Sequence, residues 1–127
     1  MVRRYLSLTE AGEVLRRGES VECFVGAIER EGERGIRWLS IRSHGSGVEV
    51  AVYESADLGS GNFTDVHEFW PLDDSLEFED PAQRLTFCTF SEAVKAIESS
   101  YPGSASRLVN ELVVQEEYAD FISSRRV

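Results

Sequence analysis

His67 is the residue of this sequence best suited to chemistry, because an imidazole can bind metal or transfer protons near neutral pH. If residues 63–70 form a strand, the side chains of Asp65 and His67 project from the same face and could meet one metal ion or substrate. Catalytic zinc usually has three protein ligands, however, and no third ligand stands at an expected spacing. His44 lies in a predicted glycine-containing turn, where we expect it to be exposed. We therefore expect no metal site and interpret His67 as a surface histidine among carboxylates.

Other catalytic patterns are missing from the sequence. The two serines that lie between glycines, Ser46 and Ser60, are not in the G-x-S-x-G arrangement of a nucleophile elbow. The glycine-rich signatures of phosphate-binding loops do not occur. Cys23 and Cys88 have no neighbouring histidine, and we expect both to be reduced, buried side chains. Adjacent acids such as those at 73–74 stand in a polar loop, where desolvation is not expected. No catalytic residue and no cofactor are predicted, and a function without catalysis is favoured.

Residues 65–80, here called the acidic segment, combine seven carboxylates with aromatic residues and contain no lysine or arginine. Aromatic side chains are frequent hot spots of protein interfaces, and opposite charge accelerates association. One interpretation is a solvated loop whose aromatic residues pack on the sheet. The other is an acidic surface with aromatic anchors that binds a basic protein. The binding residues would then be Asp65, Glu68, Trp70, Asp73, Asp74, Glu77, Phe78, Glu79 and Asp80.

The charge of the chain excludes two classes of partner. The 127 residues include 13 Lys and Arg against 23 Asp and Glu, which gives a net charge of -10. Binding to nucleic acid or to an anionic membrane surface depends on clustered basic residues, so we expect neither. The length favours one domain, residues 1–127. No apolar run approaches the roughly 18 residues that cross a bilayer, and residues 1–6 lack the apolar region of a signal peptide. The cytoplasm is therefore the expected compartment.

Hydrophobic patterning predicts the elements that would position these residues. Five strands are expected, at 21–28, 36–42, 48–53, 63–70 and 85–90. The short glycine-containing connections between the first three favour an antiparallel meander. Helices are expected at 10–17, 92–100, 104–113 and 115–124, the first capped by Thr9 and the second by Ser91. Strands grouped together with helices at the ends indicate an α+β domain, with the C-terminal helices packed on one face of the sheet.

In its small size, its acidity and its lack of catalytic motifs, the chain resembles the bacterial immunity and antitoxin proteins that block a basic toxin. The likeness is one of general character, and no family motif accompanies it. It implies a cytoplasmic inhibitor that acts by occlusion. Carboxylates of the acidic segment would take the place of nucleic-acid phosphates in a positively charged cleft of the partner.

A different class of function stays open beside this one. The chain could be a small-molecule-binding or enzymatic domain with a pocket between the sheet and the helices. The side chains expected to line such a pocket are Trp38, Tyr53, His67 and Trp70, which are aromatic or have polar tips. A structural homo-oligomer is a further possibility.

Overall fold

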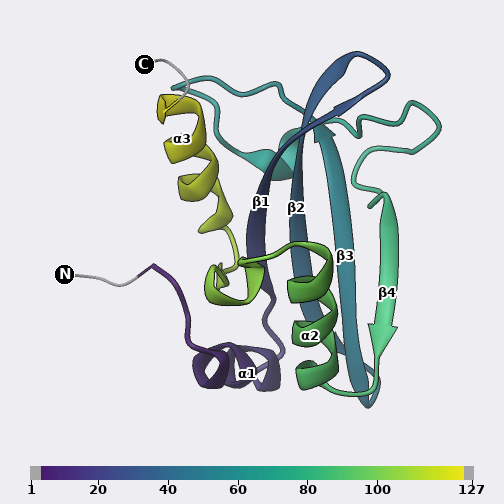
Figure 1. Ribbon diagram of the computed structural model, residues 1–127, viewed down its shortest axis with the longest axis vertical. Coiled ribbons are helices and arrows are strands. Elements are labelled where there is room, and N and C mark those ends of the chain that lie inside the picture. The colour runs from purple at the N-terminus through teal and green to yellow at the C-terminus, as the bar shows by residue number, and fades with distance from the viewer. Residues whose placement is uncertain (1–3, 125–127) are drawn as a thin grey trace.

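Residues 4–124, which the computed structural model describes, form a five-stranded antiparallel sheet with three α-helices (Figure 1). The strands are β1 (Val21–Arg30), β2 (Glu33–His44), β3 (Gly47–Ala56), β4 (Gln83–Phe87) and β5 (Val109–Asn110), in the order β4-β3-β2-β1-β5. The α-helices are α1 (Leu8–Arg16), α2 (Phe90–Ser100) and α3 (Val114–Ser124), and there are two 3₁₀ turns, η1 (Val66–Glu68) and η2 (Ser104–Ser106). The predicted α+β class is confirmed.

The first three strands form the predicted meander. The turn between β1 and β2 places Glu31 and Gly32 in the left-handed region, at φ 53° and 85°, as a tight two-residue hairpin requires. Alternation along β3 sends Val48, Val50 and Val52 to one face, where all three are buried, as the sequence predicts. Register is therefore fixed by the apolar pattern, because a shift by one residue would expose this face.

Each face of the sheet carries its own buried cluster. Face A includes Cys23, Leu39 and Val50 and is covered by α1 and α2, while face B includes Phe24 and Trp38 and is covered in part by α3 and η1. The C-terminal helices are predicted to lie on one face, but α2 lies on face A and α3 on face B. The reason is that the chain between them runs along the edge of β1 as η2 and β5. In Figure 1, α2 lies in front of the sheet, α1 lies at its lower end and α3 stands beside β1.

Two of the predicted elements are wrong. Residues 63–70 do not form a strand but contain η1, in which the Asp65 side chain accepts a hydrogen bond from the backbone N–H of His67 (3.1 Å). A side chain that bonds to nearby backbone in this way competes with strand pairing. Residues 104–113 do not form a helix, because η2 is followed by β5, which pairs with the start of β1. β5 therefore takes the place of the expected strand, and five strands remain.

The helix caps lie slightly before their predicted positions. Ser7, rather than Thr9, caps α1: its hydroxyl accepts from the N–H of Glu10 (3.1 Å), and the Glu10 carboxylate accepts from the N–H of Ser7 (2.9 Å). This reciprocal pair is a capping box. Thr89, rather than Ser91, caps α2 through its hydroxyl. Both helices therefore start earlier than expected.

The two cysteines differ in their exposure to solvent. Cys23 is buried as expected, but Cys88 is exposed, because it lies just beyond the end of β4. Both cysteines are free thiols. His44 is exposed, as predicted.

Within residues 4–124, no helix has the length and apolar character needed to cross a bilayer. The expectation about a signal peptide concerns residues 1–6, of which 1–3 lie outside the described residues.

Candidate functional site

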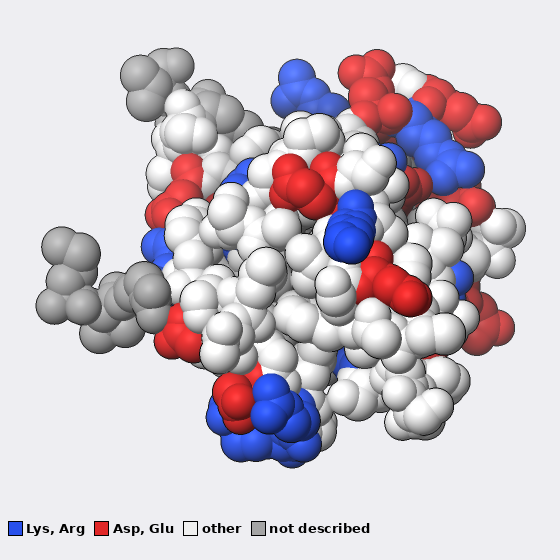
Figure 2. Space-filling view, turned by 60° about the horizontal axis from the view of Figure 1, so that its bottom comes forward, with Lys and Arg blue, Asp and Glu red and all other residues white. Residues whose placement is uncertain are grey.

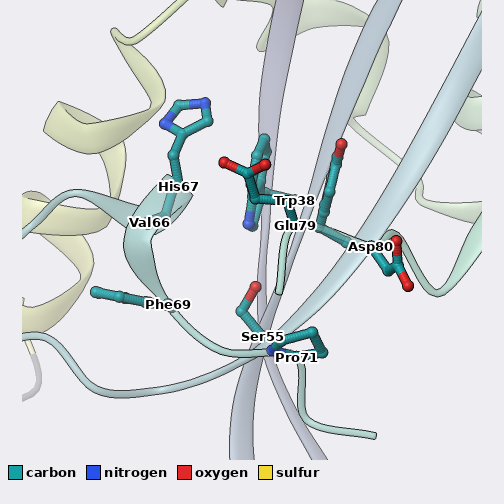
Figure 3. A pocket seen from close by; sticks show the side chains of 9 residues that line it. Trp38, Ser55, Val66, His67, Phe69, Pro71, Glu79 and Asp80 are labelled. Atoms are coloured by element: carbon teal, nitrogen blue, oxygen red, sulfur yellow. The ribbon is translucent and has the colours of Figure 1, made fainter. Parts of the chain in front are cut away.

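A pocket of about 240 Å³ lies on face B between β2, β3 and the acidic segment (Figure 3). Trp38 of β2 and Tyr53 of β3 are cross-strand partners, and their rings stack with centroids 4.2 Å apart and an interplanar angle of 10°. The full lining is Trp38, Tyr53, Ser55, Val66, His67, Phe69, Pro71, Glu79 and Asp80. The pocket therefore combines aromatic and aliphatic walls with two carboxylates.

The acidic segment forms one wall of this pocket, and hydrogen bonds fasten the segment to the second half of β3. The N–H of Ala56 donates to the carbonyl of Trp70 (2.8 Å), and the N–H of Leu72 donates to the carbonyl of Glu54 (2.9 Å). Earlier in the segment, Val66 of η1 and Phe69, which directly follows η1, are buried in the cluster that contains Trp38. Backbone pairing and burial together hold the segment over the sheet.

His67 stands between two carboxylates at the side of the pocket. Its Nε2 lies 2.7 Å from Oε2 of Glu22, and its Nδ1 lies 3.3 Å from Oδ1 of Asp65. Glu22 is only 2% exposed, and its other oxygen accepts from the N–H of Leu112 (2.7 Å). The hydrogen bond with Glu22 raises the pKa of His67 above its ordinary value, although burial acts in the opposite direction. When the ring is protonated, it can donate a hydrogen bond from each nitrogen to these carboxylates.

This arrangement suits a link between segment and sheet better than a catalytic group. Both ring nitrogens of His67 face carboxylates, so neither is free to take a proton from a substrate. No group of three or more His, Cys, Asp or Glu side chains within residues 4–124 is arranged to hold a metal ion. The link joins the acidic segment, β1 and the chain before α3 through one buried carboxylate, Glu22.

Trp38 presents a buried donor to the pocket. The residue is 3% exposed, and within the described part of the chain its Nε1–H has no hydrogen-bond partner. A buried polar group without a partner costs about 1–3 kcal/mol. Figure 3 shows the ring nitrogen at the end of the indole nearest Ser55 and Pro71 in that view. The pocket therefore offers a donor as well as carboxylates.

A second hollow of about 230 Å³ continues past His67 over the uncovered part of face B and shares the stacked aromatic pair. Glu49 is buried there and accepts hydrogen bonds from Arg42 (3.1 Å) and Arg84 (2.9 Å). Burial acts to raise the pKa of Glu49, but the two arginines outweigh it and hold the pKa below its ordinary value. Glu49 thus offsets one of the two positive charges of these arginines.

The structure brings together three of the four residues expected to line a pocket, namely Trp38, Tyr53 and His67. Trp70 lies elsewhere: it is 60% exposed and packs against Phe78 with ring centroids 5.0 Å apart. Of the acids expected to bind a protein, Glu79 and Asp80 line the pocket and Asp65 is bound to His67. The others, Glu68, Asp73, Asp74 and Glu77, lie along the acidic segment outside the pocket lining.

Glu22 is a residue of the site that was not predicted from the sequence. A sequence signal for it exists, because Glu22 is a charged residue within the apolar run that forms β1. Charged side chains are rarely fully buried unless they are paired, so such a position indicates a partner elsewhere in the chain.

Comparison of the chain with family models, with curated proteins and with solved structures finds no match to any of them.

Proposed function

We propose that this chain is a binding protein without catalytic activity, whose acidic segment recognises a basic protein partner. One observation carries the proposal. Within residues 4–124, every ion pair made by an arginine uses an acid outside residues 68–80. The carboxylates of residues 68–80 therefore form no ion pair with an arginine. Among them, the pKa of Asp73 is lowered by hydrogen bonds from Ser75 and, to a smaller extent, by the positive charge of Arg30. An uncompensated patch attracts positively charged partners and accelerates encounter.

An exposed aromatic pair supports the same surface. Trp70 leaves 60% of its surface in water while its ring rests on Phe78, and the two stand among the exposed acids of the segment. Tryptophan is enriched among the residues that dominate interface energetics. The acids would then attract and orient the partner, and Trp70 would contribute affinity by becoming buried.

The distribution of charge elsewhere is consistent with a localised binding surface. Figure 2 shows the side of the molecule that appears when the end carrying α1 comes forward. Acidic and basic side chains are interspersed there among uncharged ones. By contrast, the acidic segment contains no lysine or arginine. A basic partner would therefore dock in one orientation rather than on any side.

The mechanism we propose is occlusion, as in immunity or antitoxin proteins. Carboxylates of the acidic segment occupy a positively charged cleft that otherwise binds nucleic-acid phosphates. The net charge of -10 fits an action in the cytoplasm on a soluble partner and disfavours nucleic acid or anionic membranes as targets.

The test is capture of partners by the immobilised full chain from a host lysate, with identification by mass spectrometry. The variant D73N/D74N/E77Q removes three charges from the acidic segment. The control E29Q/E33Q/E116Q removes three charges from exposed acids on other elements. We expect a basic protein that wild type and control retain and that the segment variant loses. Equal retention by both variants would contradict the proposal, and so would a captured partner that is acidic.

A second candidate, a small-molecule-binding or enzymatic domain, is favoured by the pocket beside His67. The occupied ring nitrogens of His67 argue against a role in proton transfer. The volume of the pocket, about 240 Å³, lies below the roughly 300–1,000 Å³ of typical small-molecule sites. A structural homo-oligomer would be recognised from its mass by light scattering. Both candidates receive less support than binding through the acidic segment.

A further inference from the structure

We propose that the pocket beside Trp38 receives one lysine or arginine side chain of the basic partner, together with a carbonyl oxygen of the partner's backbone. The inference rests on the proposed function and names the part of the partner that enters the molecule. Three properties of the pocket carry it: its charge, its size and walls, and its unpaired donor.

The charge of the pocket comes from Glu79 and Asp80, which are exposed and have no basic partner within residues 4–124. One oxygen of Asp80 accepts a hydrogen bond from the backbone N–H of Glu77 (3.0 Å), which holds that carboxylate in position. His67 does not cancel this charge, because its ring is bound to two carboxylates of its own. The pocket is therefore negative even when His67 is protonated.

The size and walls of the pocket suit a single long side chain. A volume of about 240 Å³ is below that of typical small-molecule sites. The stacked rings of Trp38 and Tyr53 provide a surface for an aliphatic stem. The side chains of Val66 and Phe69 add to this surface. Lysine and arginine carry a charged end on such a stem, and Glu79 and Asp80 of the pocket lining can pair with that end.

The donor of Trp38 is independent of the acidic residues. Trp38 is more than nine-tenths buried, lines the pocket and has an indole N–H without an acceptor in the described chain. A cation cannot satisfy this donor, because an ammonium or guanidinium group has no acceptor. A peptide carbonyl can. A basic residue within a polypeptide supplies both groups at once, and this is why we assign the pocket to a protein segment.

The experiment follows the Trp38 indole N–H by ¹H–¹⁵N NMR of the full chain. The chain contains two tryptophans, so a W70F sample assigns the Trp38 signal. The probes are blocked tripeptides with arginine, lysine or norleucine between two glycines. We expect the arginine and lysine peptides to move the Trp38 proton signal downfield in a saturable way, and the norleucine peptide to leave it unchanged.

Two variants with the same change in charge separate the pocket from the rest of the segment. E79Q/D80N alters the pocket, whereas D74N/E77Q alters exposed acids of the same segment outside the pocket lining. We expect E79Q/D80N to weaken peptide binding at least tenfold and D74N/E77Q to weaken it less than threefold. The amide spectrum of each variant shows whether the fold is retained.

The outcomes distinguish this inference from the proposed function. Equal weakening by the two variants would overturn the pocket assignment, and so would equal binding of the norleucine peptide. An unmoved Trp38 signal, alongside capture of a basic partner that depends on Asp73, Asp74 and Glu77, would overturn the pocket assignment and leave the acidic surface supported. A pocket-specific shift without any captured basic partner would overturn the proposed function instead.

Discussion

Replacing Glu22 with glutamine tests the carboxylate that links the acidic segment to the sheet. Glutamine keeps the size of the side chain, and its amide oxygen can still accept from the N–H of Leu112. The loss is the negative charge 2.7 Å from Nε2 of His67. A hydrogen bond to a charged group contributes about 1.5–3 kcal/mol. The lower end applies, because the His67 side chain is 30% exposed and solvent screens the pair.

We therefore expect E22Q to lower the free energy of unfolding by about 1.5 kcal/mol near pH 6. For a domain of this size the corresponding decrease in Tm is roughly 5 °C. Urea denaturation followed by circular dichroism measures the first quantity, and a thermal scan measures the second. Full retention of stability would show that the buried carboxylate contributes nothing to holding the segment.

The effect should also depend on pH, with a sign that His67 determines. A histidine whose pKa rises on folding adds stability that is complete below its unfolded pKa and is lost as the pH rises through the folded one. Because Glu22 raises the pKa of His67, the difference between wild type and E22Q should be larger near pH 6 than near pH 8.5. Titration of the His67 ring protons by NMR should show a lower pKa in E22Q.

The matched control is the same substitution in an H67Q background. There the cost of E22Q should no longer depend on pH, because the titrating partner is missing. A stability difference that is equal at both pH values in the wild-type background would refute the reasoning. A pH dependence that persists in H67Q would assign the effect to another group.

Three further predictions concern stability and reactivity. S7A should lower the free energy of unfolding in urea by about 1 kcal/mol, whereas T9A should change it by less than about 0.5 kcal/mol, because Ser7 is the cap. Y118F should lower the free energy of unfolding by about 1–3 kcal/mol in the same assay. The reason is that the backbone N–H of Gly59, 2.9 Å from the Tyr118 hydroxyl oxygen, loses its acceptor. With a chromogenic thiol reagent, native protein should react at exposed Cys88 alone, because burial raises the pKa of Cys23 to about 12. Two reactive thiols before unfolding would contradict this burial.

Local sequence patterns are sufficient to predict β1, β2 and β3. Each has β-branched or alternating apolar residues, and glycine-containing turns separate them, so the determinants lie within a few residues of each other. The error at residues 63–70 has a local cause as well. Val66 and Phe69 are three residues apart, a helical spacing, and Asp65 precedes them as a cap, but the aromatic and β-branched content favours a strand.

No comparable local signal marks β5. Val109 and Asn110 lie in an apolar stretch whose spacing fits a helix, and their pairing with β1 depends on a partner far away in the chain. A tertiary contact of this kind overrides local propensity. The same reason explains why α2 and α3 separate onto two faces, because the path along β1 decides where α3 begins.

The candidate site is predictable to the extent that strand alternation determines it. Trp38 and Tyr53 share face B because they are paired across β2 and β3. Trp70 is different, because it follows buried Phe69 in an irregular stretch and turns outward. The contact of Glu22 with His67 joins distant parts of the chain, and only folding brings them together.

The way the acidic segment borders β3 also affects how molecules of this protein behave at high concentration. β4 pairs with β3 only from Val48 to Val52, so the second half of β3 would otherwise be an open sheet edge. Open edges invite pairing with other chains and aggregation. Pro71, which has no N–H, stands opposite Ser55 on this stretch, and Asp73 and Asp74 follow it closely in the sequence. The segment thus shields the edge and adds repulsion between molecules, and its removal would favour fibrous assembly.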